Sequence, residues 1–252
     1  ALAVGCRYAI IEVTSHGIAQ FRHRFIRFDA ALLTNIAPEH IEAHHGFESY
    51  VAAKKDLFRR VVSTGALVLN QDEPRALSFV MGSPASHSIL YGAAGIGIGD
   101  QRLDVSQVHL DAHGIKFMVG QTAFISSLEG VFNLSNILAS VAVGLYYGLT
   151  PDAIAAGVAR VRGVPGRMEY IRHEPFAVVV DYAHTPDSLK NVYAFLSQKL
   201  KIKSKELICV LGAAGGGRDT WKRPEFAKIA EQFCTSVILT NEDPYDEDPE
   251  QI

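Results

Sequence analysis

Residues 30–70 read "AALLTNIAPEHIEAHHGFESYVAAKKDLFRRVVSTGALVLN", and the pattern of this stretch decides the fold class. Two short apolar runs, 30–36 and 66–70, are typical of buried parallel strands, and residues 47–62 between them follow the spacing of an amphipathic helix. A helical crossover between two such strands leaves them parallel in one sheet. The stretch therefore predicts an α/β fold built on a parallel sheet.

The same alternation extends through the first part of the chain. "YAIIEV" at 8–13 predicts one more buried strand, and the short runs within 103–125 predict a small antiparallel patch. Helices are expected at about 133–147 and at 151–160, the second with Pro151 in its first turn. This half of the chain should therefore hold its own core.

A break in the pattern separates a second unit. "RVRGVPGRMEYI" at 160–171 combines glycine, proline and arginine, so we place a boundary there and divide the chain into domains 1–163 and 164–252. The elements that follow predict a parallel, Rossmann-like sheet: strands at 176–181, 207–212 and 236–240, and helices at 185–200 and 224–233. Such sheets bind ligands at the carboxyl ends of their strands, here at 181–184, 212–218 and 241–243.

The charge of the chain excludes some partners. With 24 basic and 27 acidic residues and a net charge of -3, no overall positive field attracts nucleic acid or anionic lipid. The uncharged segment between Glu129 and Asp152 is long enough for a membrane helix, but Asn133, Asn136 and several glycines favour a buried helix that ends near Gly148. We expect a protein that binds neither nucleic acid nor membrane.

The cysteines and the two ends of the sequence bear on compartment and completeness. Cys6, Cys209 and Cys234 lie far apart without a CxxC pair, so we expect buried, unpaired cysteines, no zinc site and a cytoplasmic protein. The chain begins without methionine or a signal-peptide pattern and stops where Asp248 and Pro249 would begin a helix. We therefore expect it to be a piece of a longer protein.

Acidic and histidine side chains follow two of the predicted strands. Glu12 ends the strand at 8–13 and His40 comes just after the strand at 30–36, so the two could bind a divalent cation at one sheet edge. The alternative is that both are solvated or hydrogen-bonded. Lys54 and Lys55 lie on the following helix, where composition alone predicts solvated lysines whose stems cover apolar surface.

Two further motifs could contact a nucleotide. Asn133 and Asn136 are three residues apart on one helix face, and their carboxamides match the donor and acceptor edge of adenine; a helix cap and a satisfied core amide remain the alternative. "GAAGGGRDTWKRP" at 212–224 is not GxxxxGK[ST], because Arg218 and Asp219 stand where lysine and a hydroxyl are needed. It is equally typical of a plain strand-to-helix turn. No other run of the sequence provides a GxxxxGK[ST] lysine, so, if ATP is used, its phosphate cradle is missing from this sequence.

Taken together, eight stretches resemble the Mur ligase family, and they occur in the family order. They fit best the branch that adds the third amino acid to UDP-N-acetylmuramoyl-L-alanyl-D-glutamate. The stretches are "EVTSHGIAQFR" (12–22), "LTNIAPEHIEAHHGFESYVAAKKDLF" (33–58), "NQDE" (70–73), "GVFNLSNILAS" (130–140), "GVPGRMEYI" (163–171), "DYAHTPDSL" (181–189), "GAAGGGRDTWKRP" (212–224) and "NEDPYDEDP" (241–249).

The resemblance implies an ATP-dependent amide ligase of peptidoglycan precursor synthesis. The substrate carboxylate would attack the γ-phosphate of ATP, and the amine of an amino-acid acceptor would then displace phosphate from the acyl phosphate. Glu12, His40 and Lys54 match the family's magnesium ligands and catalytic positions, with Lys54 as a carbamate that offers an anionic oxygen. The implied domains are an N-terminally truncated central ATP-binding domain, 1–163, and a C-terminally truncated Rossmann-like domain, 164–252.

The resemblance also assigns binding residues. The nucleotide would contact Asn133 and Asn136 at adenine, Asp181 at the ribose, and Arg167 between the domains. The remaining residues match substrate positions: Thr14, Ser15 and Arg22 for the UDP-muramoyl dipeptide, and His184, Gly215, Arg218, Asp219, Glu242 and Asp243 for the acceptor cleft.

Three departures from the family pattern carry expectations. Glu39 stands where the family usually has aspartate, and the family's UDP-binding domain and phosphate loop are absent, so we expect this chain alone to be inactive and to bind ATP weakly at most. Members that add meso-diaminopimelate carry Asp-Asn-Pro-Arg where this chain has Glu242-Asp243-Pro244-Tyr245. We therefore expect lysine or ornithine as acceptor, unless Arg218 or Lys222 replaces the missing arginine.

Other interpretations remain open at this point. The chain could be a non-catalytic remnant or binding module of the same fold, or another ligase of the superfamily, of the folate-glutamate or cyanophycin type. "EVTSHGIAQFR" and "DYAHTPDSL" favour the muramoyl branch. The sequence does not determine the oligomeric state, and we expect a monomer.

Overall fold

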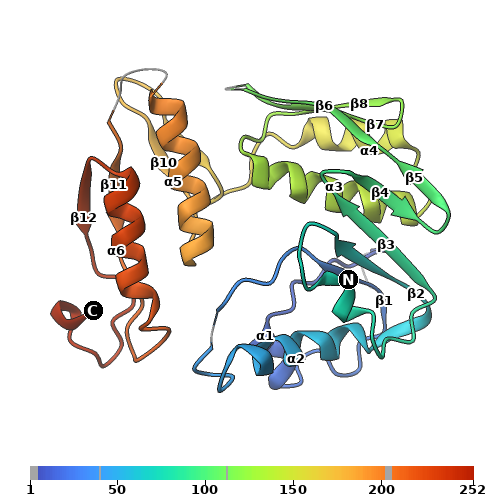
Figure 1. Cartoon of the computed structure of the whole chain (residues 1–252), viewed down its shortest axis with the longest axis horizontal. Helices are drawn as coiled ribbons and strands as arrows, with labels where there is room; N and C mark the ends of the chain where they lie inside the picture. The colour runs from blue at the N-terminus through green and yellow to red at the C-terminus, as the bar shows by residue number, and fades with distance from the viewer. Residues whose placement is uncertain (1–4, 40, 112, 202–205) are drawn as a thin grey trace.

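The computed structural model describes residues 5–39, 41–111, 113–201 and 206–252, without the side chains of 200 and 201. Its first unit begins with a five-stranded sheet in the order β1-β2-β3-β4-β5, parallel from β1 to β3 and antiparallel from β3 to β5 (Figure 1). The strands are β1 (Phe28–Leu33), β2 (Val61–Asn70), β3 (His87–Gly92), β4 (Gly95–Ile98) and β5 (Gln101–Leu103). The predicted α/β class is confirmed.

The helix between β1 and β2 is α2 (Phe47–Phe58), shorter than the predicted 47–62. It begins after Gly46, whose φ of +129° suits glycine. It ends early because Val61 already belongs to β2 and is buried at 1% exposure. The strand-helix-strand prediction is therefore right in order, but its boundaries are wrong: the strand predicted at 30–36 is β1 at Phe28–Leu33, and the strand predicted at 66–70 begins earlier, at Val61.

The rest of the first unit is a second sheet with two helices. The antiparallel order β6 (Val105–Asp111), β7 (Gly114–Val119) and β8 (Thr122–Ser126) confirms the predicted patch. α3 (Val131–Tyr146) packs on β2 and β3, and α4 (Pro151–Arg160) packs on β8 (Figure 1). Thr150 caps α4, where its hydroxyl accepts from the amide of Ala153 at 3.3 Å.

Two apolar clusters hold this unit together. One lies between α3, α4 and both sheets and contains Val68, Ile89, Tyr91 and Leu138. The other lies between α2 and the opposite face of β1 and β2. Within the described part of the chain, no helix is both long enough and apolar enough to cross a membrane. The uncharged segment after Glu129 forms α3, of which one face is buried.

The predicted strand at 8–13 is wrong. Those residues form no ladder with any described strand, and Ile10 is 100% exposed. An apolar run becomes a strand only where a neighbour accepts its backbone hydrogen bonds, and the described partner of β1 is β2 alone. The short helix α1 (Ser15–Ala19), the 3₁₀ turn η2 (Ala76–Phe79) and strands β3 to β5 were not predicted.

The second unit consists of two small sheets with helices α5 (Pro186–Lys201) and α6 (Lys222–Phe233). β11 (Ile208–Leu211) and β12 (Ser236–Leu239) pair in parallel, as predicted. The expected strand at 176–181 forms β10 (Val178–Val180), but it pairs antiparallel with β9 (Glu169–Arg172) rather than with the parallel pair. The short link between β9 and β10 favours this hairpin. The 3₁₀ turn η3 (Pro249–Gln251) ends the unit, capped by Asp248 as predicted.

The cysteine prediction is wrong in two respects. Cys209 on β11 and Cys234 at the end of α6 are joined in a disulfide, although they are 25 residues apart in sequence. Cys6 is unpaired and exposed rather than buried. Sequence spacing gave no signal for the pair, because the packing of α6 on its sheet brings the two residues together.

Candidate functional site

A cleft of about 2320 Å³ lies between the two units. One wall comes from residues 8–15, β1 and α3, and the other from the loops after β10, β11 and β12. Its volume exceeds the roughly 300–1,000 Å³ of a pocket for one small ligand. The cleft therefore has room for more than one ligand.

Lys54 projects from α2 into this cleft beside two carboxylates. Its Nζ lies 5.1 Å from the centroid of the Tyr50 ring. Burial lowers the pKa of Lys54, and the nearby charges of Glu39 and Glu12 oppose that shift without cancelling it. A lysine amine that loses its proton more readily is the form that reacts with carbon dioxide, so this environment suits the predicted carbamate.

The predicted metal ligands are brought together only in part. Glu12 and Lys54 both line the cleft, whereas His40 lies outside the described residues. Among the residues that the structure describes, no group of three or more His, Cys, Asp or Glu side chains could hold a metal ion. Carboxylate and carbamate oxygens fit magnesium chemically, so the described donors are compatible with that ion once a lysine carbamate is counted.

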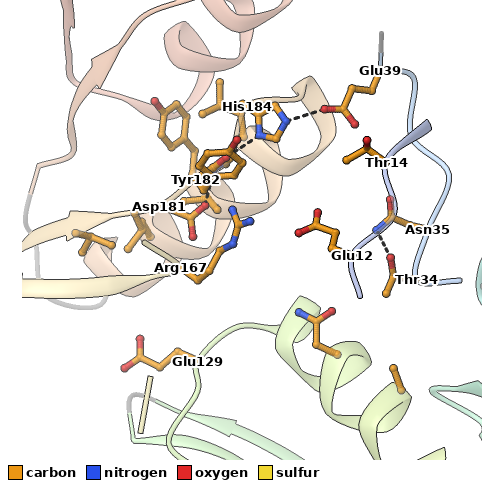
Figure 2. A pocket seen from close by; sticks show the side chains of 18 of the residues that line it. Glu12, Thr14, Thr34, Asn35, Glu39, Glu129, Arg167, Asp181, Tyr182 and His184 are labelled. Atoms are coloured by element: carbon orange, nitrogen blue, oxygen red, sulfur yellow. Dashed lines mark hydrogen bonds and ion pairs between the residues drawn. The ribbon is translucent and has the colours of Figure 1, made fainter. Parts of the chain in front are cut away.

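Glu39 and His184 join the two walls of the cleft (Figure 2). The Nε2 atom of His184 lies 2.7 Å from a carboxylate oxygen of Glu39, and its Nδ1 lies 2.8 Å from the carbonyl of Tyr182. The hydrogen bond to Glu39 raises the pKa of His184, although burial opposes this. No sequence pattern indicates this pair, whose members are 145 residues apart.

Asp181 and Arg167, the predicted ribose and interdomain residues, lie on the wall formed by the second unit, across the cleft from Glu12 and Lys54. Asp181 accepts the amides of Met168 at 2.7 Å and Ala183 at 2.8 Å, so its carboxylate already orders the loop after β10. The guanidinium of Arg167 lies 4.4 Å from the Tyr182 ring centroid. Figure 2 shows Arg167 and Glu12 extending toward the same space from opposite sides. A ligand in that space would contact both units.

The asparagine pair is a surface feature of α3 rather than a cap and a core amide. The helix begins at Val131 with Gly130 as its N-cap, so Asn133 lies inside the first turn. Its Nδ2 donates to the carbonyl of Glu129 at 2.7 Å, and its Oδ1 accepts from Asn136 at 3.3 Å. Asn136 is exposed and lines the cleft. The adenine role of the pair stays a prediction.

Of the three residues predicted to bind the dipeptide, two line the cleft. Thr14 caps α1, where its hydroxyl accepts from the amide of Gly17 at 3.1 Å, and Ser15 is buried beside it. Arg22 is exposed and is not among the described residues that line the cleft. The local structure of α1 therefore supports Thr14 and Ser15 more than Arg22.

The glycine-rich loop is held close to the segment that follows β12. Gly215 donates to the carbonyl of Asp243 at 2.9 Å, and a Cβ at this position would clash with the Pro244 backbone. Asp219 and Lys222 form an ion pair at 2.7 Å with side chains only 9% and 7% exposed. Lys222 is thus already engaged, which leaves Arg218 as the exposed cation of the loop.

The predicted acceptor residues form the last part of the wall. Glu242 and Asp243 are exposed and line the cleft. Tyr245 has a φ of +55° and accepts a hydrogen bond from Arg218 at 3.0 Å through its hydroxyl. The guanidinium of Arg218 therefore contacts a hydroxyl rather than a carboxylate, and Arg218 lines the same cleft as Glu242 and Asp243. Sequence reasoning missed this contact.

Two family descriptions match the chain in sequence. The Mur ligase middle domain matches residues 1–144, and the Mur ligase, glutamate ligase domain matches residues 166–252. The first match covers more than half of the chain.

Curated and solved relatives agree with these matches. A UDP-N-acetylmuramoyl-L-alanyl-D-glutamate--2,6-diaminopimelate ligase from Synechocystis sp. is 39% identical over 261 residues, which cover 100% of this chain and 50% of the relative. A solved structure described by the same enzyme name is 31% identical with a TM-score of 0.63, and covers 99% of this chain and 51% of its own.

A further solved structure shares the fold. A solved complex of FPGS with AMPPCP and folate has a TM-score of 0.62 at 20% identity, and covers 86% of this chain and 52% of its own. At that identity the likeness concerns the fold alone. The chain spans about half the length of the relatives that it matches. From its two family matches and its 39% identical relative, the chain belongs to the Mur ligase family.

Proposed function

We propose that the protein to which this chain belongs is an ATP-dependent amide ligase. It would add the third amino acid to UDP-N-acetylmuramoyl-L-alanyl-D-glutamate in peptidoglycan precursor synthesis. The observation that carries this proposal is the cleft itself, where Glu12 of the first unit faces Arg167 of the second (Figure 2) and where Lys54 and Asp181 are also lining residues. The relatives' names support the choice of reaction.

We propose that different residues of the two walls bind different substrates. Asn136 and Asp181 would orient the nucleotide, and Thr14 and Ser15 would orient the dipeptide. Arg167 would offset negative charge on the transferring phosphoryl group, because a preorganised cation stabilises charge that develops in the transition state. Catalysis would then consist mostly of positioning ATP, the dipeptide and the amino acid within one cleft.

Magnesium is the metal that we propose for this site. Glu12 and a carbamate on Lys54 would hold it together with His40, and the bound ion would supply charge neutralisation at the phosphates. The lowered pKa of Lys54, caused by burial, favours the neutral amine from which a carbamate forms. The fit rests on the chemistry of these donors.

The chain alone is not the proposed catalyst. No GxxxxGK[ST] loop occurs in its 252 residues, and backbone amides with a lysine supply much of the affinity for phosphates. We propose that a longer protein, with central-domain residues 1–163 and C-terminal-domain residues 164–252, carries the activity. Its cytoplasmic location and monomeric state stay predictions.

The acceptor is proposed to be a diamino acid. Tyr245 stands where members that add meso-diaminopimelate carry an arginine for the distal carboxylate, which lysine and ornithine lack. Glu242 and Asp243 line the cleft and suit a side-chain ammonium but would repel a second carboxylate, so we favour lysine or ornithine over meso-diaminopimelate. The relatives, however, are named for 2,6-diaminopimelate. In this chain Arg218 is exposed and donates a hydrogen bond to Tyr245, the residue that stands where those enzymes carry the arginine. If Arg218 held the distal carboxylate, the preference would be reversed.

The test is phosphate release by the full-length protein with ATP, the UDP-muramoyl dipeptide and each amino acid in turn. We expect release to require all three substrates and to be at least about tenfold faster with lysine or ornithine than with meso-diaminopimelate. A clear preference for meso-diaminopimelate refutes the acceptor. No release with any amino acid favours the non-catalytic remnant, and release with folate in place of the dipeptide favours the folate-glutamate type.

A further inference from the structure

Glu129, Tyr170 and Lys199 form a closed polar cluster between the two units. Lys199 donates to both carboxylate oxygens of Glu129, at 2.9 and 2.7 Å, and lies 2.8 Å from the Tyr170 hydroxyl. Tyr170 donates to Glu129 at 3.0 Å. Glu129 precedes α3, whereas Tyr170 lies on β9 and Lys199 on α5. The cluster therefore ties the start of α3 to two elements of the second unit.

This cluster is sheltered from solvent, unlike a typical surface ion pair. The side chains of Lys199 and Glu129 are 21% and 14% exposed. Burial alone would lower the pKa of Lys199, but its hydrogen bonds to Glu129 and Tyr170 outweigh burial and raise it. Partly buried, charge-assisted hydrogen bonds are stronger than exposed ones, because water competes less for the same groups.

An apolar contact lies next to the cluster. Phe132, one residue before Asn133, packs against the apolar core of the second unit, which contains Met168, Tyr193 and Phe226. Gly130 permits this arrangement, because it has a φ of +89° and a Cβ there would meet the Phe132 ring at 2.6 Å. Glu129 just before α3 and Phe132 within its first turn are thus both held by the second unit.

The backbone carbonyl of Glu129 links this cluster to Asn133 and Asn136. Its carbonyl accepts the Nδ2 of Asn133 at 2.7 Å, and the Oδ1 of Asn133 accepts from Asn136 at 3.3 Å. A path of hydrogen bonds therefore runs from Lys199 on α5, through Glu129, to the carboxamide of Asn136 in the cleft. The position of the second unit and the orientation of both carboxamides depend on the same residue.

We propose that Glu129 is a positioning residue, whose side chain latches the second unit to α3 through Lys199 and Tyr170 while its carbonyl orients Asn133. The latch rests on the contacts of Glu129, Tyr170 and Lys199 described above. Its link to the nucleotide rests on the function proposed above. As a consequence, the carboxamides of Asn133 and Asn136 are oriented for a nucleotide only while Glu129 contacts Lys199 and Tyr170.

The test measures amide hydrogen exchange of peptides that cover 127–137 in the 252-residue chain. Lys199→Met and Glu129→Gln should each raise exchange at the start of α3 about tenfold, because each removes charge-assisted hydrogen bonds. Lys228→Met is the matched control, since it breaks an ion pair of 2.7 Å within α6, with side chains 70% and 43% exposed. It should leave the peptide unchanged.

A double-mutant cycle keeps the proposal falsifiable if one variant is unstable. Exchange in Glu129→Gln/Lys199→Met should exceed the wild type by no more than either single variant does, since both changes break the same interaction. Tyr170→Phe removes one hydroxyl and gives a milder test with a smaller increase. Additive effects of the two changes, or equal loosening by Lys228→Met, overturn the latch.

The nucleotide link is tested separately in the full-length protein. Lys199→Met should raise the KM for ATP several-fold and leave kcat within about twofold, because the adenine contact is made equally in the ground state and the transition state. An unchanged KM, with exchange loosened at α3, refutes the link to the nucleotide and leaves the latch intact. A wild-type protein without ligase activity refutes the proposed function alone.

Discussion

The two units differ in what holds them in place. In the first, Val68, Ile89 and Tyr91 are fully buried between both sheets and α3. In the second, the paired strands β11 and β12 leave Val210 and Leu239 67% and 80% exposed. The described contacts between the units include the polar pairs Glu39–His184 and Glu129–Lys199 in addition to Phe132. The first unit is thus an apolar scaffold, against which the second is positioned largely by charged side chains.

The difference bears on function because both walls contribute to one cleft. Lys54 and Asn136 come from helices of the scaffold, whose positions are fixed by packing. Asp181, His184 and Arg218 come from loops of the second unit, whose positions depend on hydrogen bonds. Substitutions should therefore affect the two walls by different mechanisms.

The largest stability effect is expected from Lys222→Met in the second unit. This change removes the ammonium that forms an ion pair with the buried Asp219 at 2.7 Å. Glu42 also interacts with Asp219, and burial, followed by the hydrogen bond to Asp219, raises the pKa of Glu42. Breaking one side of a buried pair costs about 3–5 kcal/mol. Urea unfolding measures the loss, and a cost below about 1 kcal/mol would show that the second unit does not depend on this pair.

Shortening an apolar side chain in the core of the first unit should lower the free energy of unfolding by about as much, because it leaves a cavity rather than an uncompensated charge. Ile89→Ala leaves a cavity at a fully buried position and should cost about 2–5 kcal/mol. Val210→Ala, at 67% exposure on β11, should change stability by less than about 0.5 kcal/mol. The same urea measurement compares them. Equal costs at the two positions would mean that the exposed face of β11 is covered in solution.

The smallest expected effect is the pH dependence of stability that arises from Glu247, in the segment after β12. Arg223 donates to both carboxylate oxygens of Glu247, at 2.7 and 2.8 Å, and with the amide of Gly217 it lowers the pKa of Glu247 to about 2. The folded state therefore favours the ionised form. The contribution is complete above the ordinary value of 4.5 and is lost as pH falls through about 2.

Unfolding across pH compares the wild type with Glu247→Gln. The stability difference between them should be constant above about pH 5 and should shrink between about pH 4.5 and 2. A difference that stays constant over that window would mean that the bidentate contact does not form in solution.

The sequence predicted those features that depend on local pattern. The strand-helix-strand order at 30–70 and the Pro151 and Asp248 helix starts follow from periodicity and capping, which act within a few residues. The run at 8–13 has the apolar composition of a strand, but a strand also needs a partner, and the local pattern does not report one. Strands β3 to β5 are short and contain several glycines, so their pattern is weak.

The candidate site was predictable as a set of residues and not as a set of contacts. Resemblance to the family selected Glu12, Lys54 and Asp181, all of which line one cleft. The pairs Glu39–His184 and Glu129–Lys199 join residues 145 and 70 positions apart, and charge alone does not select partners over such separations. The disulfide between Cys209 and Cys234 was missed for the same reason.

The central claim is that Lys54, carbamylated and therefore anionic, serves in a ligase site on the wall formed by the first unit. The substitution Lys54→Ala in the full-length protein tests this claim most directly. The variant should keep its fold by circular dichroism and lose most of its phosphate release with ATP, the dipeptide and the acceptor. Added acetate or formate should restore part of that release, because a small carboxylate can replace the carbamate oxygens. Full activity of Lys54→Ala without any added carboxylate would contradict the account.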